Sequence, residues 1–224
     1  MKARLLRFKD LNPTVRHFDF ETETPIDFQP GQFVSLKGLF DGKEIIRPYS
    51  IASAPQGNQF SLCLNRVEGG IFSPHLFELT PGAEVEFGPP LGVVTLRHSG
   101  RDTLLVATGT CIAHRRSMLY GHLPTAGRID LLFGARHEHG LVYAAEFKAL
   151  EERYGGFRFY PTITRPEREW QGRSGRVQTH LVELIDGRRD LDIYLCGLKE
   201  MVDDVRTRLK QMGFDRKQII YEKY

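Results

Sequence analysis

The sequence predicts two domains of different fold class, an antiparallel Greek-key-type β-barrel followed by a parallel-sheet α/β domain. Up to about Arg97, short segments rich in β-branched and aromatic residues alternate with Pro- and Gly-containing turns, as antiparallel strands do. After residue 101, strand-like and helix-like segments alternate, which is typical of βαβ units. We therefore expect domains of residues 1–99 and 100–224, within the usual size range for a chain of 224 residues.

The first domain contains six predicted strands and one predicted helix. The expected strands are residues 3–8, 15–21, 31–38, 44–53, 59–67 and 83–88. Residues 72–79 have a helical pattern, with Ser73 expected as the N-cap and Pro74 at the first helical position. The strand 44–53 carries Pro48, which has no N–H for a central strand ladder. We expect its neighbour at that point to be a bound ligand and not another strand.

The second domain begins with the buried apolar strand 103–108 and then alternates. The further expected strands are residues 128–135, 157–164, 192–196 and 218–224, and the expected helices are 112–123, 142–155, 176–185 and 199–213. This order predicts a parallel sheet with helices on its faces.

Composition and charge exclude several classes of protein. With 41% hydrophobic and 26% charged residues the chain resembles an ordinary globular protein, and a net charge of +3 does not predict nucleic-acid binding. The N-terminus lacks the apolar core of a signal peptide, and no segment has the apolar length of a membrane span. Three separated cysteines form no metal-binding motif, so we expect a reduced, cytoplasmic protein without a metal site. Local basic clusters are expected to be solvated faces or, alternatively, contacts for an acidic protein; they are Lys2, Arg4, Arg7 and Lys9, Arg115 and Arg116, and Arg188 and Arg189.

Several strand ends of the second domain carry small or polar residues. The strand 103–108 leads into "TGTC" and a helix, where backbone N–H groups suit a pyrophosphate. Open α/β sheets bind ligands at the carboxyl ends of their strands. Arg136, Thr164 with Arg165, and Cys196 with Gly197 occupy three more such ends, which predicts a nucleotide crevice.

In the first domain, the two-residue period of a strand places Arg47 and Tyr49 on one face and Pro48 and Ser50 on the other. An arginine can hold a phosphate with two donors while a neighbouring aromatic ring packs on a planar heterocycle. An edge strand whose tyrosine packs on the barrel is the structural alternative.

The chain resembles the ferredoxin–NADP reductase family in several motifs that follow one another in the family's order and spacing. These are "RPYSIAS", "LNRVEGGIFSPHL", "PGAEVEFGPPLG", "ATGTCIAHRRSML", "YLCGLKEMVDDV" and the terminal "YEKY". The resemblance covers essentially the whole chain and implies an FAD-binding barrel followed by an NAD(P)-binding α/β domain.

The resemblance also implies roles for single residues. Arg47 matches the family arginine that contacts the FAD pyrophosphate. Tyr49 matches the tyrosine stacked on the isoalloxazine, and Ser50 matches the serine near the flavin N5 atom. It further assigns FAD contacts to Pro48, Asn65, Val67, Gly70, Ile71, Phe72 and Ser73. In this interpretation flavin lines the free side of Pro48.

For the nucleotide, the resemblance implies contacts by Thr108, Gly109, Thr110 and Cys111, and by Cys196 and Gly197 beside the nicotinamide. Thr164 and Arg165 match the site of the NADP 2′-phosphate, which favours NADP over NAD. The terminal Tyr224 matches an aromatic residue that covers the flavin. Ser50, Cys196 and Tyr224 are thus the implied catalytic residues. Cys111 and His114 replace a glycine and a proline of the usual family loop.

The implied activity is electron transfer between NAD(P)H and a separate one-electron carrier such as ferredoxin, flavodoxin or an oxygenase component. Two alternatives stay open: an NADH-dependent flavin or oxygenase reductase component, and a non-catalytic FAD-binding electron-transfer subunit.

Overall fold

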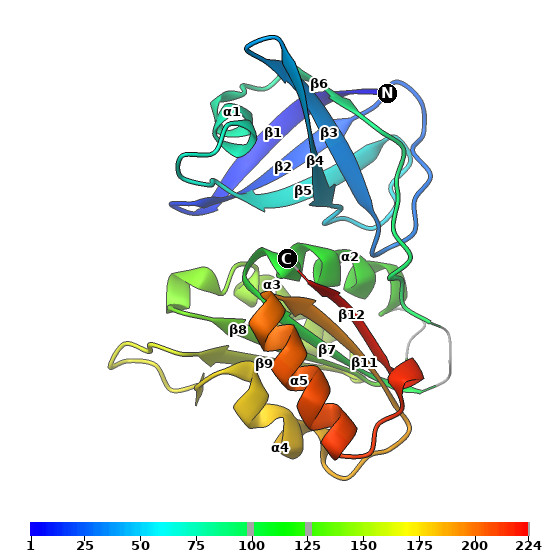
Figure 1. Ribbon diagram of the computed structural model, residues 1–224, viewed down its shortest axis with the longest axis vertical. Helices are drawn as coiled ribbons and strands as arrows, with labels where there is room; N and C mark the ends of the chain where they lie inside the picture. The colour runs from blue at the N-terminus through cyan, green and yellow to red at the C-terminus, as the bar shows by residue number, and fades with distance from the viewer. Residues whose placement is uncertain (98–100, 124–126, 224) are drawn as a thin grey trace. The chain divides into compact units, whose positions relative to one another are not determined.

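The computed structural model describes residues 1–97, 101–123 and 127–223, and its chain divides into two compact units (Figure 1). The first unit consists of residues 1–96 together with 113–121, and the second of residues 97–112 together with 122–224. The predicted domain boundary between residues 99 and 100, and Tyr224, lie outside the described residues.

The first unit is built on a six-stranded antiparallel sheet in the order β4-β3-β6-β1-β2-β5. Its elements are β1 (Lys2–Asn12), β2 (Val15–Glu21), β3 (Phe33–Phe40), β4 (Lys43–Ser50), β5 (Gln59–Asn65), α1 (Phe72–Glu78) and β6 (Glu84–Phe87). Figure 1 shows the strands curling around a common interior, with α1 at one end. The interior is aromatic: Phe20 stacks on Phe60 with ring centroids 5.5 Å apart, and Phe60 lies 5.3 Å from Phe87. The predicted antiparallel barrel is confirmed.

Strand β4 lies at one edge of this sheet, which explains how it accommodates a proline. It pairs with β3 alone among the named strands of the described chain, with Pro48 opposite Ser35. The strand ends at Ser50, three residues earlier than expected, and Ile51 then forms an isolated bridge to Leu62. The missing N–H of Pro48 therefore interrupts no ladder in the middle of the sheet.

Helix α1 begins at Phe72, two residues earlier than expected from Ser73 as N-cap and Pro74 as the first helical residue. Its N-cap residue is Ile71, which makes no side-chain capping hydrogen bond, so Ser73 lies inside the first turn. The Ser73 hydroxyl instead accepts a hydrogen bond of 2.9 Å from the backbone N–H of Val67. The expectation that Ser73 caps the helix is wrong, because its side chain closes the preceding turn.

Asp19 on β2 connects three strands of the first unit. Its Oδ1 lies 2.9 Å from His17 Nε2 and accepts a hydrogen bond of 2.6 Å from Ser61, while Arg7 Nε donates to Oδ2 at 2.7 Å. Burial alone would raise the pKa of this carboxyl, but the hydrogen bonds from His17, Ser61 and Arg7 outweigh it and hold the pKa well below its ordinary value.

We expect Asp19→Asn to lower the free energy of unfolding by about 2 kcal/mol at pH 7, because charge-assisted hydrogen bonds are lost. A carboxyl with a depressed folded-state pKa stabilises the fold fully above its unfolded pKa of about 3.9, and this contribution is lost progressively as the pH falls from that value through the lower folded-state pKa, so it is smaller at pH 3 than at pH 7. Urea unfolding at pH 7 and pH 3 checks this. A difference between variant and wild type that is as large at pH 3 as at pH 7 would contradict it.

The basic clusters are only partly solvated. Lys2, Arg4 and Arg7 form ion pairs with Glu84, Glu21 and Asp19, respectively, along the outside of the sheet. Arg115 is fully buried in α2 (Ile112–His122), so the expectation of a solvated face is wrong for this residue. Burial of a charged helix residue depends on tertiary packing, which a cluster of like charges does not reveal.

Residues 113–121 of α2 belong to the first unit through specific contacts. Ser117 Oγ donates to the carbonyl of Ser53 and Arg116 Nη1 to that of Ala52, both at 2.7 Å. His114 Nε2 lies 3.2 Å from the carbonyl of Val94. The helix therefore contacts backbone carbonyls of two segments of the first unit, Ala52 and Ser53 after β4 and Val94 after β6.

The second unit is a six-stranded parallel sheet in the order β10-β9-β8-β7-β11-β12. Its strands are β7 (Asp102–Thr108), β8 (Ile129–Ala135), β9 (Phe157–Ile163), β10 (Arg173–Ser174), β11 (Leu191–Gly197) and β12 (Ile219–Lys223). Its α-helices are α3 (Ala144–Arg153), α4 (Leu181–Ile185) and α5 (Lys199–Gln211), with short 3₁₀ turns at Gly109–Cys111, Glu138–Gly140, Val177–His180 and Arg216–Gln218.

Helices cover both faces of this sheet. Helices α4 and α5 pack on one face through a shared apolar cluster with β7 and β11. On α3, Phe147 contacts Phe159 of β9, whose neighbour Tyr160 packs on the α4–α5 side. Because neighbouring strand residues point to opposite faces, α3 lies on the other face. The predicted α/β fold is confirmed, although β10 was not predicted and the expected helix 176–185 begins as a 3₁₀ turn.

An ionic network closes the amino-terminal edge of this sheet. Arg188 donates to Asp102 at 2.8 Å and to Asp130 at 2.6 Å, and its guanidinium also reaches the carbonyls of Leu184 and Ile185. Asp130 is almost fully buried. Arg188 is thus a structural residue and not a surface contact for a partner.

Candidate flavin and nucleotide sites

The "RPYS" segment lies on the edge strand β4 with its arginine exposed. Arg47 Nη1 donates to the carbonyl of Ile46 at 2.9 Å. Within the described part of the chain, no carboxylate lies within ion-pair distance of Arg47. Among the described residues the guanidinium thus has no carboxylate counter-ion, which suits the binding of an anionic ligand.

Tyr49 packs on the first turn of α1. Its ring is half-buried and lies 6.2 Å from that of Phe72. Burial raises the pKa of the Tyr49 phenol to about 12, with Arg47 opposing the shift, so the ring is neutral at physiological pH. This geometry fixes the plane of an aromatic ring beside an unpaired cation.

The segment between β5 and α1 forms a tight turn with apolar residues exposed. Val67 and Ile71 are both 56% exposed, while the N–H of Gly70 donates to the carbonyl of Val67 at 3.0 Å. A Cβ on Gly70 would lie 3.1 Å from that carbonyl, so the turn favours glycine. Asn65 ends β5 just before this turn and is exposed. Of the predicted residues here, Phe72 and Ser73 are buried.

These features fit FAD. A planar ring needs an apolar surface, and the exposed Val67 and Ile71 lie in the turn that Ser73 joins to α1, next to Phe72 and Tyr49. A pyrophosphate needs a cation, and Arg47 has no carboxylate partner among the described residues. Strand β4, which carries Pro48, is an edge strand of its sheet. The structure thus brings the predicted flavin residues of the first unit together on β4 and the β5–α1 turn.

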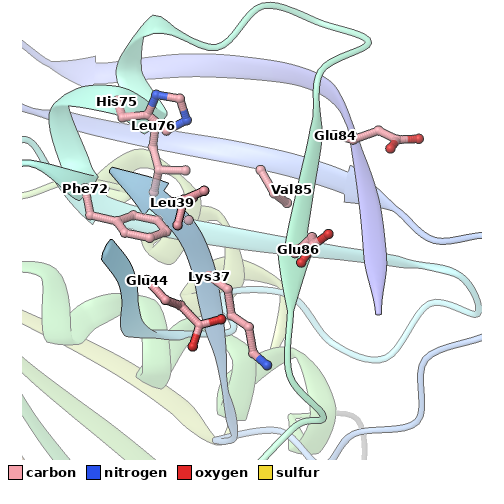
Figure 2. Close-up of a pocket in the computed structure, with 10 residues that line it drawn as sticks. Lys37, Leu39, Glu44, Phe72, His75, Leu76, Glu84, Val85 and Glu86 are labelled. Carbon is pink, nitrogen blue, oxygen red and sulfur yellow. The ribbon is translucent and has the colours of Figure 1, made fainter. Parts of the chain in front are cut away.

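A separate pocket of about 350 Å³ opens between α1 and the strands β3, β4 and β6 (Figure 2). It forms where β3 and β6 separate, because their pairing ends at Lys37 and Glu86. Figure 2 shows Leu39, Phe72 and Val85 around its centre. Phe72 is its only predicted flavin residue, so this pocket does not coincide with the flavin site built around Arg47.

In the second unit, the chain order reverses between β7 and β11, which is the point where open α/β sheets bind ligands. Thr108 ends β7, and Gly109 follows with a φ of 60°, a left-handed conformation that favours glycine. A Cβ on Gly197 would lie 2.3 Å from Thr108 Oγ1, so the glycine permits the two strand ends to approach closely. The predicted Thr108 loop and the Cys196–Gly197 pair are therefore neighbours.

The loop after β7 is a 3₁₀ turn of Gly109, Thr110 and Cys111, and Cys111 is buried in it. The side chain of Cys111 therefore points into the protein and not toward solvent. The loop thus accommodates a cysteine, where the family usually has glycine, by burying the Cys111 side chain.

Arg136, predicted as a strand-end residue of the nucleotide crevice, and Arg165, predicted for the 2′-phosphate, lie side by side at the ends of β8 and β9. The N–H of Arg165 donates to the carbonyl of Arg136 at 2.9 Å, and the N–H of Thr164 donates to the carbonyl of Ala135. Both arginines and Thr164 are exposed. Sequence reasoning missed Arg176, which is exposed. It directly follows Gly175, and the Gly175 N–H donates to the carbonyl of Ile163 at the end of β9. Its basic side chain in "GRSGRV" was the available signal.

Cys196 is fully buried at the end of β11, directly opposite Glu222 of β12. The Cys196 sulfur and a Glu222 carboxylate oxygen lie within 4.8 Å of one another. Glu222 was also missed, although the terminal "YEKY" contained it. Ser50 belongs to the first unit and Cys196 to the second, and Tyr224 lies outside the described residues.

An edge strand suited to a flavin and a parallel sheet suited to a nucleotide define a two-part flavoprotein oxidoreductase. Comparison with family models agrees: residues 2–96 match the oxidoreductase FAD-binding domain and residues 105–207 match the oxidoreductase NAD-binding domain. Ferredoxin–NADP reductase B of Sorangium cellulosum (strain So ce56) is 38% identical over all of this chain and 97% of its own length. The chain belongs to the ferredoxin–NADP reductase family and is an FAD- and NAD(P)-dependent oxidoreductase.

Other relatives are longer. The toluate 1,2-dioxygenase electron transfer component of Pseudomonas putida is 30% identical over 88% of this chain and 59% of its own length. Among solved structures, a ferredoxin NADP⁺ reductase from Neisseria gonorrhoeae with bound FAD and NADP has a TM-score of 0.87 at 23% identity and covers 100% of this chain and 98% of its own. The FAD/NAD-binding domain of nitric oxide dioxygenase from Vibrio cholerae has a TM-score of 0.91 at 22% identity, with coverage of 100% and 98%. These two likenesses show the fold.

No helix in the described ranges has both the length and the apolar character needed to cross a membrane.

Proposed function

We propose that this chain is a cytoplasmic reductase that transfers electrons between NADPH and a separate one-electron carrier, such as ferredoxin or flavodoxin. Residues 1–99 hold FAD in this proposal and residues 100–224 hold the nucleotide. The observation that carries it is the match over 97% of a ferredoxin–NADP reductase, together with two ligand-suited units in one chain. FAD, when bound, accepts two electrons as hydride and releases them singly.

The residues of the first unit bind and orient the flavin in this proposal. Arg47 donates paired hydrogen bonds to the pyrophosphate, and the neutral ring of Tyr49 packs on the isoalloxazine. Ser50 offers a hydroxyl near N5. The other proposed flavin contacts are Asn65, Val67 and the turn of residues 70–73.

The residues of the second unit orient the nicotinamide. Thr108 and Gly197 supply a narrow strand edge, and Cys196 lines it. Glu222 has a carboxylate that accepts hydrogen bonds from an amide NH₂, such as that of a nicotinamide carboxamide. Tyr224, which lies outside the described residues, keeps in this proposal the role that the family resemblance implies: a ring that covers the flavin until the nucleotide displaces it, at a cost of roughly 0.5–1.5 kcal/mol for one stacked pair.

Steady-state reduction of ferricyanide by the FAD-loaded protein with NADPH and with NADH tests the proposal. We expect a higher kcat/KM with NADPH, because Thr164, Arg165, Arg136 and Arg176 offer donors that only the 2′-phosphate uses. No reduction with either nucleotide would contradict the reductase proposal.

Arg165→Ala is expected to lower kcat/KM for NADPH by about 10- to 100-fold, the value of one charge-assisted hydrogen bond, and to leave NADH unchanged. Arg168→Ala is the matched control, since it removes the same charge from the same exposed loop. Equal losses with both nucleotides would remove Arg165 from the 2′-phosphate site.

A second candidate is an NADH-dependent oxygenase reductase component, because several relatives are named as electron transfer or reductase components of oxygenases. A preference for NADH, combined with electron transfer to an oxygenase component, would favour this candidate.

A further inference from the structure

Strand β12 ends the described chain, and its two faces make different contacts. Because strand residues alternate, Tyr221 and Lys223 share one face and Glu222 points to the other. Glu222 lies beside Cys196, whereas Lys223 and Tyr221 reach charged residues of α5. One face of β12 therefore carries Glu222, the candidate nicotinamide contact, and the other carries the side chains that attach β12 to α5.

Asp203 of α5 lies at the centre of the contacts that attach β12 to α5. Its Oδ1 accepts from Lys223 Nζ at 2.5 Å, and Lys199 Nζ lies 3.1 Å from Oδ2. Arg206, one turn further along α5, lies over the Tyr221 ring at 3.7 Å and pairs with Asp203. The hydrogen bond from Lys223 lowers the pKa of Asp203 to about 2, so this carboxylate is ionised at neutral pH.

The backbone register makes these contacts relevant to the site. Lys223 pairs with Gly197 and Glu222 with Cys196. Lys223, which Asp203 holds, is therefore next to Glu222 in β12 and opposite the residue after Cys196 in β11. Pairing with β11 is available on one side of β12 only, because β12 is the edge strand of the sheet. The contacts of Lys223 and Tyr221 to α5 therefore give this edge strand a second attachment besides β11.

We propose that Asp203 is a positioning residue: through Lys223 it fixes the end of β12 and so holds the Glu222 carboxylate beside Cys196. This inference rests on the proposed function, in which Cys196 and Glu222 contact the nicotinamide. The effect is modest, because the ion pair is partly exposed, and corresponds to a two- to fivefold change.

Two measurements on the full-length, FAD-loaded protein test it: amide hydrogen exchange of residues 219–223 and kcat for ferricyanide reduction by NADPH. We expect Asp203→Asn and Lys223→Gln each to speed exchange and to lower kcat two- to fivefold. Asp204→Asn is the matched control, because Asp204 pairs with Arg208 on the same helix and its loss changes the net charge equally. It is expected to change neither measurement.

The Glu222→Gln variant separates the possible failures. We expect it to lower kcat by itself, and Asp203→Asn added to it to cause no further loss. Amide exchange in Asp203→Asn that is no faster than in the Asp204→Asn control would show that Asp203 does not fix the end of β12. Faster exchange with unchanged kcat, while Glu222→Gln lowers kcat, would overturn the positioning role. A Glu222→Gln variant with wild-type kcat would instead show that the proposed nicotinamide contact is wrong.

Discussion

Replacing Arg47 by alanine is expected to weaken FAD binding by about 10- to 100-fold. The guanidinium is exposed on the edge strand β4 and has no carboxylate partner in the described residues, so its donors are available to a pyrophosphate. Loss of one charge-assisted hydrogen-bonding group on an ionic ligand costs roughly 1.5–3 kcal/mol. Titration of the FAD-free protein with FAD, followed by flavin fluorescence, measures the change.

The control is Lys43→Ala, which removes the same positive charge from the same strand. We expect it to change FAD affinity less than twofold. Arg47→Lys keeps the charge but loses the two parallel donors, and we expect an intermediate affinity. Equal affinity in Arg47→Ala and Lys43→Ala would show that Arg47 does not hold the pyrophosphate.

Replacing Arg188 by alanine is expected to lower the free energy of unfolding of the second unit by about 3–5 kcal/mol. The substitution leaves Asp130, whose side chain is 1% exposed, with Arg128 at 3.2 Å as its one remaining ion-pair partner among the described residues. A buried carboxylate that has lost its main partner pays its desolvation cost without compensation. Urea unfolding followed by far-ultraviolet circular dichroism measures the loss.

Arg189→Ala is the matched control, since this neighbouring arginine is exposed and forms no salt bridge with a described carboxylate. A shift below 1 kcal/mol is expected for it. The double variant Arg188→Ala with Asp130→Asn is expected to recover part of the lost stability, because the unpaired charge is removed. No recovery in the double variant would contradict the buried-charge explanation.

The sequence predicted the parts of the fold that depend on local pattern. For Pro48 the sequence left two possibilities, a bound ligand beside the strand or a sheet edge; β4 is at an edge, where a missing N–H is tolerated, and Pro48 has Ser35 of β3 opposite it. The alternation of strands and helices after residue 101 indicated a parallel sheet. Carboxyl ends of parallel strands share one edge, so Thr108 and Gly197 were expected as neighbours and are neighbours.

Features that depend on tertiary contacts were not predictable from the sequence. Ser73 has the residue type and position of an N-cap, but the N–H of Val67 takes its hydroxyl. Arg115 looked solvated beside Arg116, although it is buried. Glu222 lies beside Cys196 only because β12 pairs with β11 in one particular register, which neither segment specifies alone.

The visible absorption spectrum of the purified protein, recorded without oxygen during titration with NADPH, tests the central claim most directly. The account predicts a yellow protein with one FAD per chain, whose flavin absorbance is bleached by about one equivalent of NADPH. A colourless protein that fails to bind added FAD, or a yellow one that NADPH does not bleach, would contradict it.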